Sequence, residues 1–395
     1  MSPHVLIAPS GFKESLGAEE VTEAIAKGVL RALPSAKIMK APLVDGGEGF
    51  TKALVEATGG TLHELTVTGP VGQPVASFFG FLGGKQEKRT AVLEMAAAAG
   101  LRLVPRDLRD PLVTTTYGVG ELIKAALDHG AERILVGCGD SGTNDGGAGM
   151  AQALGVRLLD EHENEIGLGG NELIKLRRII LSHRDPRLQH TQIDVACNWH
   201  NVLCGPKGVA RVFGPQKGAS PETVERLAAA LDNFADVIVR YLGIDARFMP
   251  GGGASGGLGA GLHALLGAKL HPRYDVVMQY LQFDDLLGCA DLVFTAEGSL
   301  DYQTPAGKIP AEVGRRAKQH GLPVIALAGT IGKDAEINFA HGIDSFTSIL
   351  EAPCTLVEAI DRAPLLVKHA AECAMRMIMV GAQLKPKFAS RFFMQ

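Results

Sequence analysis

The chain has few aromatic residues, no C-x-x-C pair and no long apolar run. Only 5% of its 395 residues are aromatic, and one of them is tryptophan. The six cysteines are scattered, which argues against a zinc site or a disulfide framework and fits a reducing compartment. No stretch of 18 uncharged apolar residues is present, and the N-terminus lacks the basic and apolar segments of a signal peptide. We therefore expect a cytoplasmic protein that does not enter a membrane.

An excess of positive charge is also missing. The chain carries 39 Lys and Arg against 43 Asp and Glu, a net charge of −4. A nucleic-acid-binding protein would carry a basic face to match phosphates, so nucleic acid is not an expected partner. With 46% hydrophobic and 21% charged residues the chain is of globular type, and its length predicts two or three domains.

Glycine, in contrast, is abundant. The 49 glycines gather in separate motifs and follow no fixed period, which excludes collagen-like and linker sequences. Clusters of glycine between apolar runs are typical of backbone that approaches a ligand closely, often a phosphate.

The two ends of the sequence share one pattern. An apolar run at 5–8, a helical pattern at 18–33 and a second apolar run at 38–44 predict a βαβ unit with parallel strands. Strand-like runs at 291–295, 323–328 and 345–350 repeat the pattern. The long segment between the two ends of the sequence does not follow it. We expect an α/β fold: a discontinuous doubly wound parallel-sheet domain (1–60 and 286–380), a second α/β domain inserted at 61–285, and the active site in the cleft between them.

Residues 138–150 form the most informative motif. They follow an apolar run at 133–136 and precede a helical pattern at 148–154. Small residues allow backbone N–H groups to approach an anion, and the helix N-terminus adds its positive dipole end. Side chains that could assist in binding a nucleotide are Ser141, Thr143, Asn144 and Asp145. A purely structural turn is the alternative.

Two further segments are candidate phosphate sites. Lys217 stands between glycines just before the helical pattern from residue 221, and lysine is a compact charge suited to phosphate. The run 251–256 matches G-x-G-x-x-G without the preceding strand that a dinucleotide site needs, and offers Gly253, Ser255 and Gly256. A solvated turn for the first segment and a tight helix start for the second are the alternatives.

Carboxylates follow two of the expected strands. Asp45 and Glu48 come after the second strand, and Glu297 and Asp301 after the strand at 291–295. Carboxylates at such positions can hold Mg²⁺ or accept the proton of a substrate hydroxyl, and helix or turn capping is the alternative. Lys13, which follows the first strand, and Lys308 are candidate cations, with a solvated surface role as the default.

Taken in order, these segments resemble the glycerate kinase type 1 family. The matching stretches are IAPSGFKESL (7–16), APLVDGGEGF (41–50), PLVTTTYGVGELI (111–123), SGTNDGGAGMAQALG (141–155), GPKGVARVFGPQKGA (205–219), GGGASGGLGAGL (251–262) and AEGSLDYQTPAGK (296–308). The resemblance implies ATP- and Mg²⁺-dependent phosphorylation of D-glycerate on two α/β domains, one of them flavodoxin-like and discontinuous.

The chain departs from the family pattern at several positions. Ser10-Gly11 stand where the family has Asp-Ser, Asn198 stands in a usually acidic stretch, and Ser299 and Tyr302 replace Arg and Gly. These changes weaken any metal or base role carried over to Ser10 and Asn198. They also suggest an altered acceptor.

The resulting hypothesis is a kinase that acts by positioning and electrostatics. Lys217 and backbone N–H groups hold the phosphates of ATP, and Glu297 and Asp301 support Mg²⁺. Asp45, with Glu48, orients or deprotonates the hydroxyl of a small hydroxy acid, and Lys13 neutralises its carboxylate or the transferring group. Alternatives are a kinase for a four-carbon aldonate and an inactive relative that binds a nucleotide or metabolite. A homodimer is left open.

Overall fold

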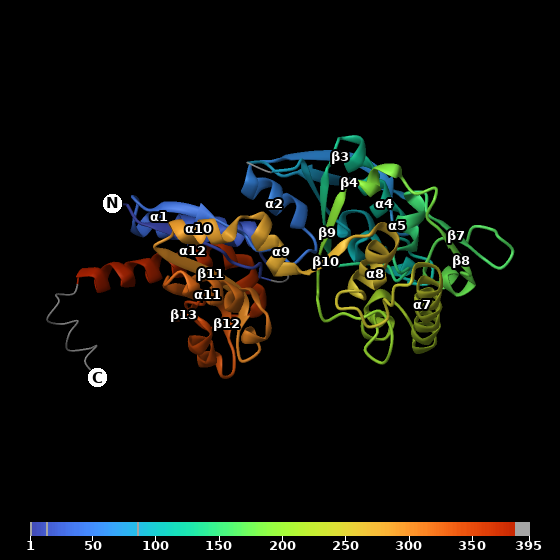
Figure 1. Ribbon diagram of the computed structural model, residues 1–395. Coiled ribbons are helices and arrows are strands. Elements are labelled where there is room, and N and C mark those ends of the chain that lie inside the picture. The colour runs from blue at the N-terminus through green and yellow to red at the C-terminus, as the bar shows by residue number, and fades with distance from the viewer. Residues whose placement is uncertain (1, 13–14, 85–86, 384–395) are drawn as a thin grey trace. The chain divides into compact units, whose positions relative to one another are not determined.

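The computed structural model describes residues 2–12, 15–84 and 87–383 and divides the chain into two compact units. Unit 1 contains the residues up to Val44 and from Met278 onward, and unit 2 is the continuous segment Asp45–Val277. Figure 1 labels many of their elements along the chain. In the part of the chain that the structure describes, no helix is long and apolar enough to cross a membrane.

Unit 1 has one parallel sheet. Its strands are β1 (His4–Ile7), β2 (Lys37–Lys40), β11 (Leu292–Leu300), β12 (Val324–Ile331) and β13 (Ser345–Ser348). The spatial order is β13-β12-β11-β1-β2, so that, numbered by its own strands, the sheet runs 2-1-3-4-5, the order of flavodoxin-like sheets. All four strand pairs are parallel. Such a sheet binds ligands beyond the carboxyl ends of its strands, at the point where the strand order reverses; here that point lies between β1 and β11.

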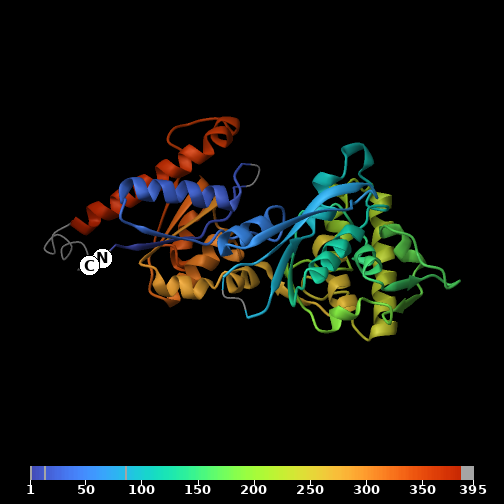
Figure 2. The same ribbon diagram turned by 90° about the horizontal axis from the view of Figure 1, so that it is seen from above.

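Helices cover both faces of this sheet. They are α1 (Ala18–Ala32), α10 (Phe283–Cys289), α11 (Ile309–Gln319) and α12 (Leu356–Gln383). Figure 2 shows α1 and α12 together on one face and α10 and α11 on the other. The apolar side of α1 predicted from the sequence is buried here: Val21, Ile25 and Val29 are fully buried and pack in one cluster with Leu366 and Val367 of α12.

Unit 2 is built on a six-stranded mixed sheet. In spatial order its strands are β10 (Lys269–Pro272), β9 (Gln192–Cys197), β6 (Arg133–Cys138), β5 (Thr90–Glu94), β4 (Pro74–Phe81) and β3 (Thr61–Thr68). The first four run parallel and the last two add an antiparallel edge. A separate hairpin pairs β7 (Arg157–Leu159) with β8 (Arg178–Ile180).

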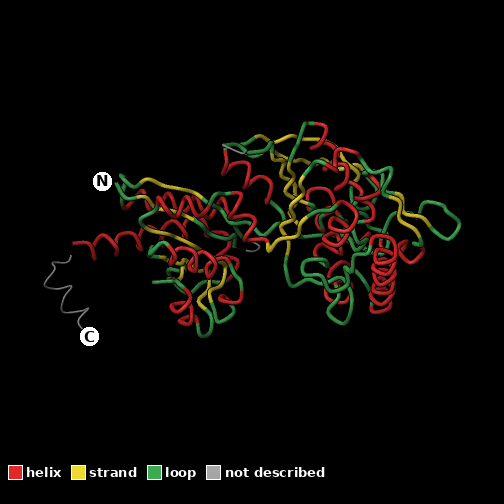
Figure 3. Tube along the Cα trace, viewed as in Figure 1, coloured by secondary structure: helices red, strands yellow, loops and turns green. Residues whose placement is uncertain are grey.

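The helices of unit 2 position its loops. They are α2 (Phe50–Thr58), α3 (Ala96–Ala99), α4 (Tyr117–Asp128), α5 (Ala148–Ala153), α6 (Val209–Phe213), α7 (Pro221–Leu242) and α8 (Ala254–Leu266), and α9 (Arg273–Tyr280) crosses into unit 1. Figure 3 shows the strands of each unit flanked by helices. The expected α/β class with parallel sheets is confirmed.

The unit boundaries differ from the expected domain limits at 60/61 and 285/286. Phe50 of α2 is fully buried, and a Cβ on Gly137 of β6 would lie 2.6 Å from its ring. This packing joins residues 45–60 to unit 2. The strand expected at 38–44 ends at Lys40, although the N–H groups of Ala41 and Leu43 still bond to Ile7 and Pro9. Pro42 has no N–H to donate.

Candidate functional site

Lys217 is buried at the centre of the glycine-rich loops of unit 2. It ends the short 3-10 helix Pro215–Lys217, and its side chain reaches the loop after β6. Its Nζ atom donates to Ser141 Oγ at 2.8 Å, Thr143 O at 2.6 Å and Asn144 Oδ1 at 3.3 Å. Three acceptors match the three protons of an ammonium group. The lysine therefore fixes the conformation of the 141–144 loop, which is a different role from that of a solvated turn residue.

Burial also changes the protonation of this lysine. Lys217 is 2% exposed, and removal from water lowers its pKa to about 7, although the nearby charge of Asp145 acts in the opposite direction. A neutral amine can still donate two hydrogen bonds and accept one from the Ser141 hydroxyl. The same three partners can thus hold both protonation states near neutral pH.

Asp145 joins this loop to the start of α5. Its carboxylate accepts hydrogen bonds from Thr116 N (2.8 Å), Thr116 Oγ1 (2.8 Å), Gly147 N (3.1 Å) and Gly149 N (3.2 Å). Burial raises the pKa of this carboxyl group, and the hydrogen bonds partly offset the increase. With its acceptors used in this way, Asp145 organises the loop and caps the start of α5.

The start of α8 packs directly on the same loop. Ser255, Gly256 and Gly257 have φ values of 52°, 70° and 92°, so the helix is interrupted there. A Cβ on Gly256 would lie 2.0 Å from the carbonyl oxygen of Thr143, and Gly146 donates to the Gly256 carbonyl oxygen at 3.0 Å. Only glycine fits this left-handed position so close to the neighbouring backbone. Gly253 packs similarly against Val202, and its N–H bonds to Asn201.

Two polar atoms of this loop are buried and have no hydrogen-bond partner among the described residues. They are Thr143 Oγ1 and Asn144 Nδ2, in side chains with no exposed surface. Buried polar groups are nearly always hydrogen-bonded, so each such exception needs an explanation. A hydroxyl and an amide can both donate to phosphate oxygens, and this observation makes the loop compatible with a polyphosphate ligand.

The loop that carries Asp45 and Glu48 lies on the carboxyl ends of β6 and β9. A Cβ on Gly46 would lie 3.0 Å from the carbonyl oxygen of Ala196, and one on Gly139 would lie 2.6 Å from the Cα atom of Gly47. Asp140 accepts a hydrogen bond from Glu48 N at 2.9 Å. The strand ends of unit 2 therefore support this loop directly.

Glu94, at the end of β5, fixes the other end of the loop. It accepts hydrogen bonds from Gly49 N (3.1 Å) and Thr51 N (2.8 Å) and so caps the N-terminus of α2. It is 3% exposed, and burial raises its pKa. Glu94 and Asp140 were not among the predicted site residues, although Glu94 ends β5 and Asp140 lies two residues after β6.

Two arginines contact the carboxylates of this loop. Arg102 Nη1 lies 2.7 Å from Glu48 Oε2, and Arg273 Nη1 lies 3.5 Å from Asp45 Oδ2. Arg273 follows β10, whose neighbour β9 supports Gly46. Neither arginine could be recognised in the sequence, because each lies outside the glycine motifs and far along the chain from its partner.

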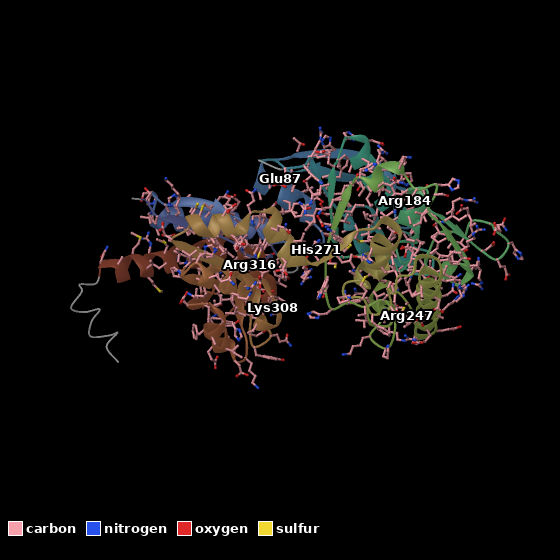
Figure 4. All side chains as sticks on the ribbon, viewed as in Figure 1. Glu87, Arg184, Arg247, His271, Lys308 and Arg316 are labelled. Carbon is pink, nitrogen blue, oxygen red and sulfur yellow. The ribbon has the colours of Figure 1, made fainter. Side chains whose placement is uncertain are left out.

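Unit 1 carries the second group of predicted residues. Glu297 lies on β11, and Asp301 follows it and accepts from Gln303 N at 2.8 Å and from Ser299 Oγ at 3.2 Å. Lys308 Nζ lies 3.3 Å from Asp301 Oδ1 and 3.1 Å from the Ser299 carbonyl oxygen; Figure 4 labels this lysine. Burial tends to raise the pKa of Asp301, but the Gln303 hydrogen bond and the Lys308 charge outweigh it and leave the pKa lowered.

These residues lie at the end of β11, on one side of the point where the strand order reverses. On the other side, Ser10 follows β1 and donates from N and Oγ to the carbonyl oxygen of Ala296, with Oγ–O at 3.0 Å. Lys13 lies outside the described residues. Among the residues that the structure describes, no group of three or more His, Cys, Asp or Glu side chains is arranged to hold a metal ion. Mg²⁺ commonly needs only one or two carboxylates besides phosphates and water, and an ionised Asp301 suits that requirement.

The structure therefore forms two groups from the predicted residues, one in each unit. Unit 2 brings together the residues predicted to bind nucleotide, with the Asp45 loop on adjacent strand ends. The residues of this first group are Ser141, Thr143, Asn144, Asp145, Lys217, Gly253, Ser255 and Gly256. Unit 1 holds Glu297, Asp301 and Lys308.

Comparisons with known proteins agree over nearly the whole chain. The model of the "Glycerate kinase family" matches residues 5–379. A Bacillus subtilis glycerate kinase is 49% identical over 91% of this chain and 93% of its own, and an Escherichia coli glycerate 2-kinase is 46% identical over 90% and 92%. A crystal structure of a Salmonella typhimurium LT2 protein proposed to be glycerate kinase 2 superposes with a TM-score of 0.85 at 45% identity, over 97% of this chain and all of that one.

Proposed function

Because the chain belongs to the glycerate kinase family, we propose that it transfers the γ-phosphoryl group of ATP to a hydroxyl of D-glycerate or a closely related hydroxy acid. The observation that carries this proposal is the family match over residues 5–379, which includes every candidate segment named above. The buried loop around Lys217, with its two polar atoms without a partner, supports a phosphate site independently of the family.

The residues of unit 2 would bind the polyphosphate. Thr143 Oγ1 and Asn144 Nδ2 would donate to phosphate oxygens. The N–H groups of Gly146, Gly147 and Gly149 at the start of α5 already donate within the protein, so these two side chains would be the donors. Lys217 would hold this loop in its binding conformation and add positive charge behind it. Such a rigid arrangement contributes to catalysis because it needs no reorganisation during the reaction.

The reacting groups would be held by the carboxylates. ATP supplies the phosphoryl group, and Mg²⁺ neutralises the charge of its phosphates. Asp45 would orient the acceptor hydroxyl and take its proton as that oxygen forms its new bond to phosphorus, and Glu48 would assist. Glu297 and Asp301 would support the metal ion, and Lys13 would neutralise the acceptor or the transferring group.

We also propose that the protein acts in the cytoplasm. All six cysteines lie within the described residues and are free thiols, which fits the reducing conditions of a cytoplasm.

The test is to identify the phosphorylated product. The chain is incubated with ATP, MgCl₂ and D-glycerate, L-glycerate, erythronate or threonate, while ADP release is followed and the product is examined by phosphorus NMR. We expect ADP release with D-glycerate and one new phosphate monoester, whose coupling pattern identifies the phosphorylated hydroxyl. Preference for erythronate or threonate would redirect the proposal to a four-carbon acceptor. If the chain binds ATP but releases no ADP in the presence of any of these acids, kinase activity would be contradicted.

A further inference from the structure

The carboxyl-end edge of the unit 2 sheet is rich in negative charge. Four carboxylates lie in or against the 45–49 loop: Asp45, Glu48, Glu94 and Asp140. The hydroxy-acid acceptor of the proposed reaction is itself an anion, and like charges repel. An acceptor that reaches Asp45 therefore needs a cation close to that side chain.

Lys217 does not fill this need, because its amino group is used within the 141–144 loop. Lys13, proposed above to neutralise the acceptor or the transferring group, lies outside the described residues. Two arginines of unit 2 contact the 45–49 loop, Arg102 and Arg273. They differ in surroundings. Arg102 is 81% exposed and already forms a 2.7 Å ion pair with Glu48, so it is a solvated surface group.

Arg273 is placed differently. Its side chain is 29% exposed, and its guanidinium carbon lies 4.6 Å from the ring centroid of Tyr274, which restricts its orientation. Figure 4 labels His271 on β10, two residues before it. The contact to Asp45 is long, 3.5 Å, and occupies one of the five N–H donors of the guanidinium group. A partly buried, oriented fork of donors suits a carboxylate, which accepts two parallel hydrogen bonds.

We infer that Arg273 binds the carboxylate of the acceptor and makes the enzyme selective for hydroxy acids over neutral polyols. This inference rests on the proposed function. The Asp45 contact shows that the guanidinium group can reach a carboxylate at this position. With an acceptor bound at Arg273, a hydroxyl next to the acceptor carboxylate lies on the side of Asp45, the group proposed to take its proton.

The test compares acceptors with and without the carboxylate. The KM for D-glycerate, the inhibition constant of neutral D-glyceramide and the KM for ATP are measured for the wild-type chain, Arg273→Gln and Arg273→Lys. The control is Arg178→Gln, which removes an arginine on β8 of the same unit and its exposed ion pair with Glu163. Thermal unfolding verifies that each variant is folded, and Arg273→Lys keeps the positive charge if the glutamine variant is unstable.

We expect Arg273→Gln to raise the KM for D-glycerate about 10- to 100-fold, with D-glyceramide and ATP changed less than about threefold. Arg273→Lys should lie between wild type and the glutamine variant, because it retains charge without the fork. Arg178→Gln should match the wild type. An unchanged KM for D-glycerate, or equal losses for acid and amide, would overturn the inference.

Failure of the proposed function has a separate signature. A wild-type chain that releases no ADP with D-glycerate contradicts the kinase proposal and not the carboxylate site. In that case calorimetric titration with D-glycerate still tests Arg273, because the inference requires binding that Arg273→Gln weakens and Arg178→Gln does not.

Discussion

The Nζ atom of Lys217 lies 2.6 Å from the carbonyl oxygen of Thr143, at a position where the lysine is 2% exposed. The two residues are 74 positions apart in the chain. Their contact joins the turn before α7 to the loop before α5, and it explains why this loop can be rigid although it consists of small residues.

Replacing Lys217 by methionine should disable the loop with little loss of fold. Methionine fills much of the same space but cannot donate to Ser141, Thr143 or Asn144. We expect kcat/KM for ATP to fall about 100-fold or more, as when a positioning contact is lost. Steady-state kinetics and calorimetric ATP titration measure the effect. Lys175→Met, which removes an exposed lysine paired with Glu172, is the control and should stay near wild type.

The lowered pKa of Lys217 should appear in the pH dependence of stability. Its folded-state pKa of about 7 lies below the unfolded value near 10.5, so between these values the unfolded chain binds more protons. The contribution of this lysine to the free energy of unfolding therefore rises with pH from about 7 to 10 and is lowest below pH 7. Urea unfolding of wild type and Lys217→Met at several pH values isolates it as a difference. A difference that does not change with pH would refute the lowered pKa.

Gly256, near the start of α8, and Gly267, its C-cap residue, offer a matched pair of substitutions. Both have positive φ, 70° and 76°, but a Cβ at Gly256 would meet the Thr143 carbonyl oxygen at 2.0 Å, whereas nothing lies within 4 Å of one at Gly267. We expect Gly267→Ala to cost about 1 kcal/mol and Gly256→Ala at least about 2 kcal/mol more. The second variant should also weaken ATP binding, because it displaces the carbonyl group that Lys217 contacts. Equal costs in urea unfolding would show that the contact is unimportant.

Asp45→Asn tests the proposed proton acceptor. The amide keeps the shape of the side chain and can still accept from Gly47 N, which lies 3.3 Å from Asp45 Oδ1. We expect kcat to fall about 100- to 10,000-fold while the KM for ATP changes little. A folded variant with near-normal turnover would remove this role from Asp45.

Asp301→Asn tests the proposed metal support in unit 1. Activity should be lost in excess EDTA and return with MgCl₂. In the variant, the Mg²⁺ concentration for half-maximal rate should rise about 10-fold or more, because an amide is a weaker ligand than a carboxylate. Glu351→Gln, at an exposed ion pair of the same unit, is the control. An unchanged Mg²⁺ requirement would exclude Asp301 as a metal-supporting residue.

Much of the architecture could be predicted because local sequence patterns determine the individual strands and helices. The apolar runs before Ser10 and Cys138 gave strands with loops at their carboxyl ends, and the 3.6-residue spacing of Val21, Ile25 and Val29 gave the buried side of α1. The strand predicted at 291–295 is longer than expected, because β11 continues to Leu300 and includes Glu297. The unit boundary was less accurate. The burial of Phe50 against Gly137 is a tertiary contact that no local pattern records.

The site was predictable only in its motifs. A lysine between glycines looks the same in sequence whether it is solvated or buried, and the burial of Lys217 depends on acceptors more than 70 positions away. Arg273 and Asp45 are 228 positions apart. Contacts over such separations are set by strand order, which periodicity alone does not determine.

The discontinuity of unit 1 has a consequence for biosynthesis. Strands β1 and β2 are made first, but β1 pairs with β11, which is translated more than 280 residues later. Unit 2 is one continuous segment and can complete its core on the ribosome, since domains generally fold as units in the order of their synthesis. Strand β1 and helix α1 therefore stay without their packing partners until β11 and α12 have been translated.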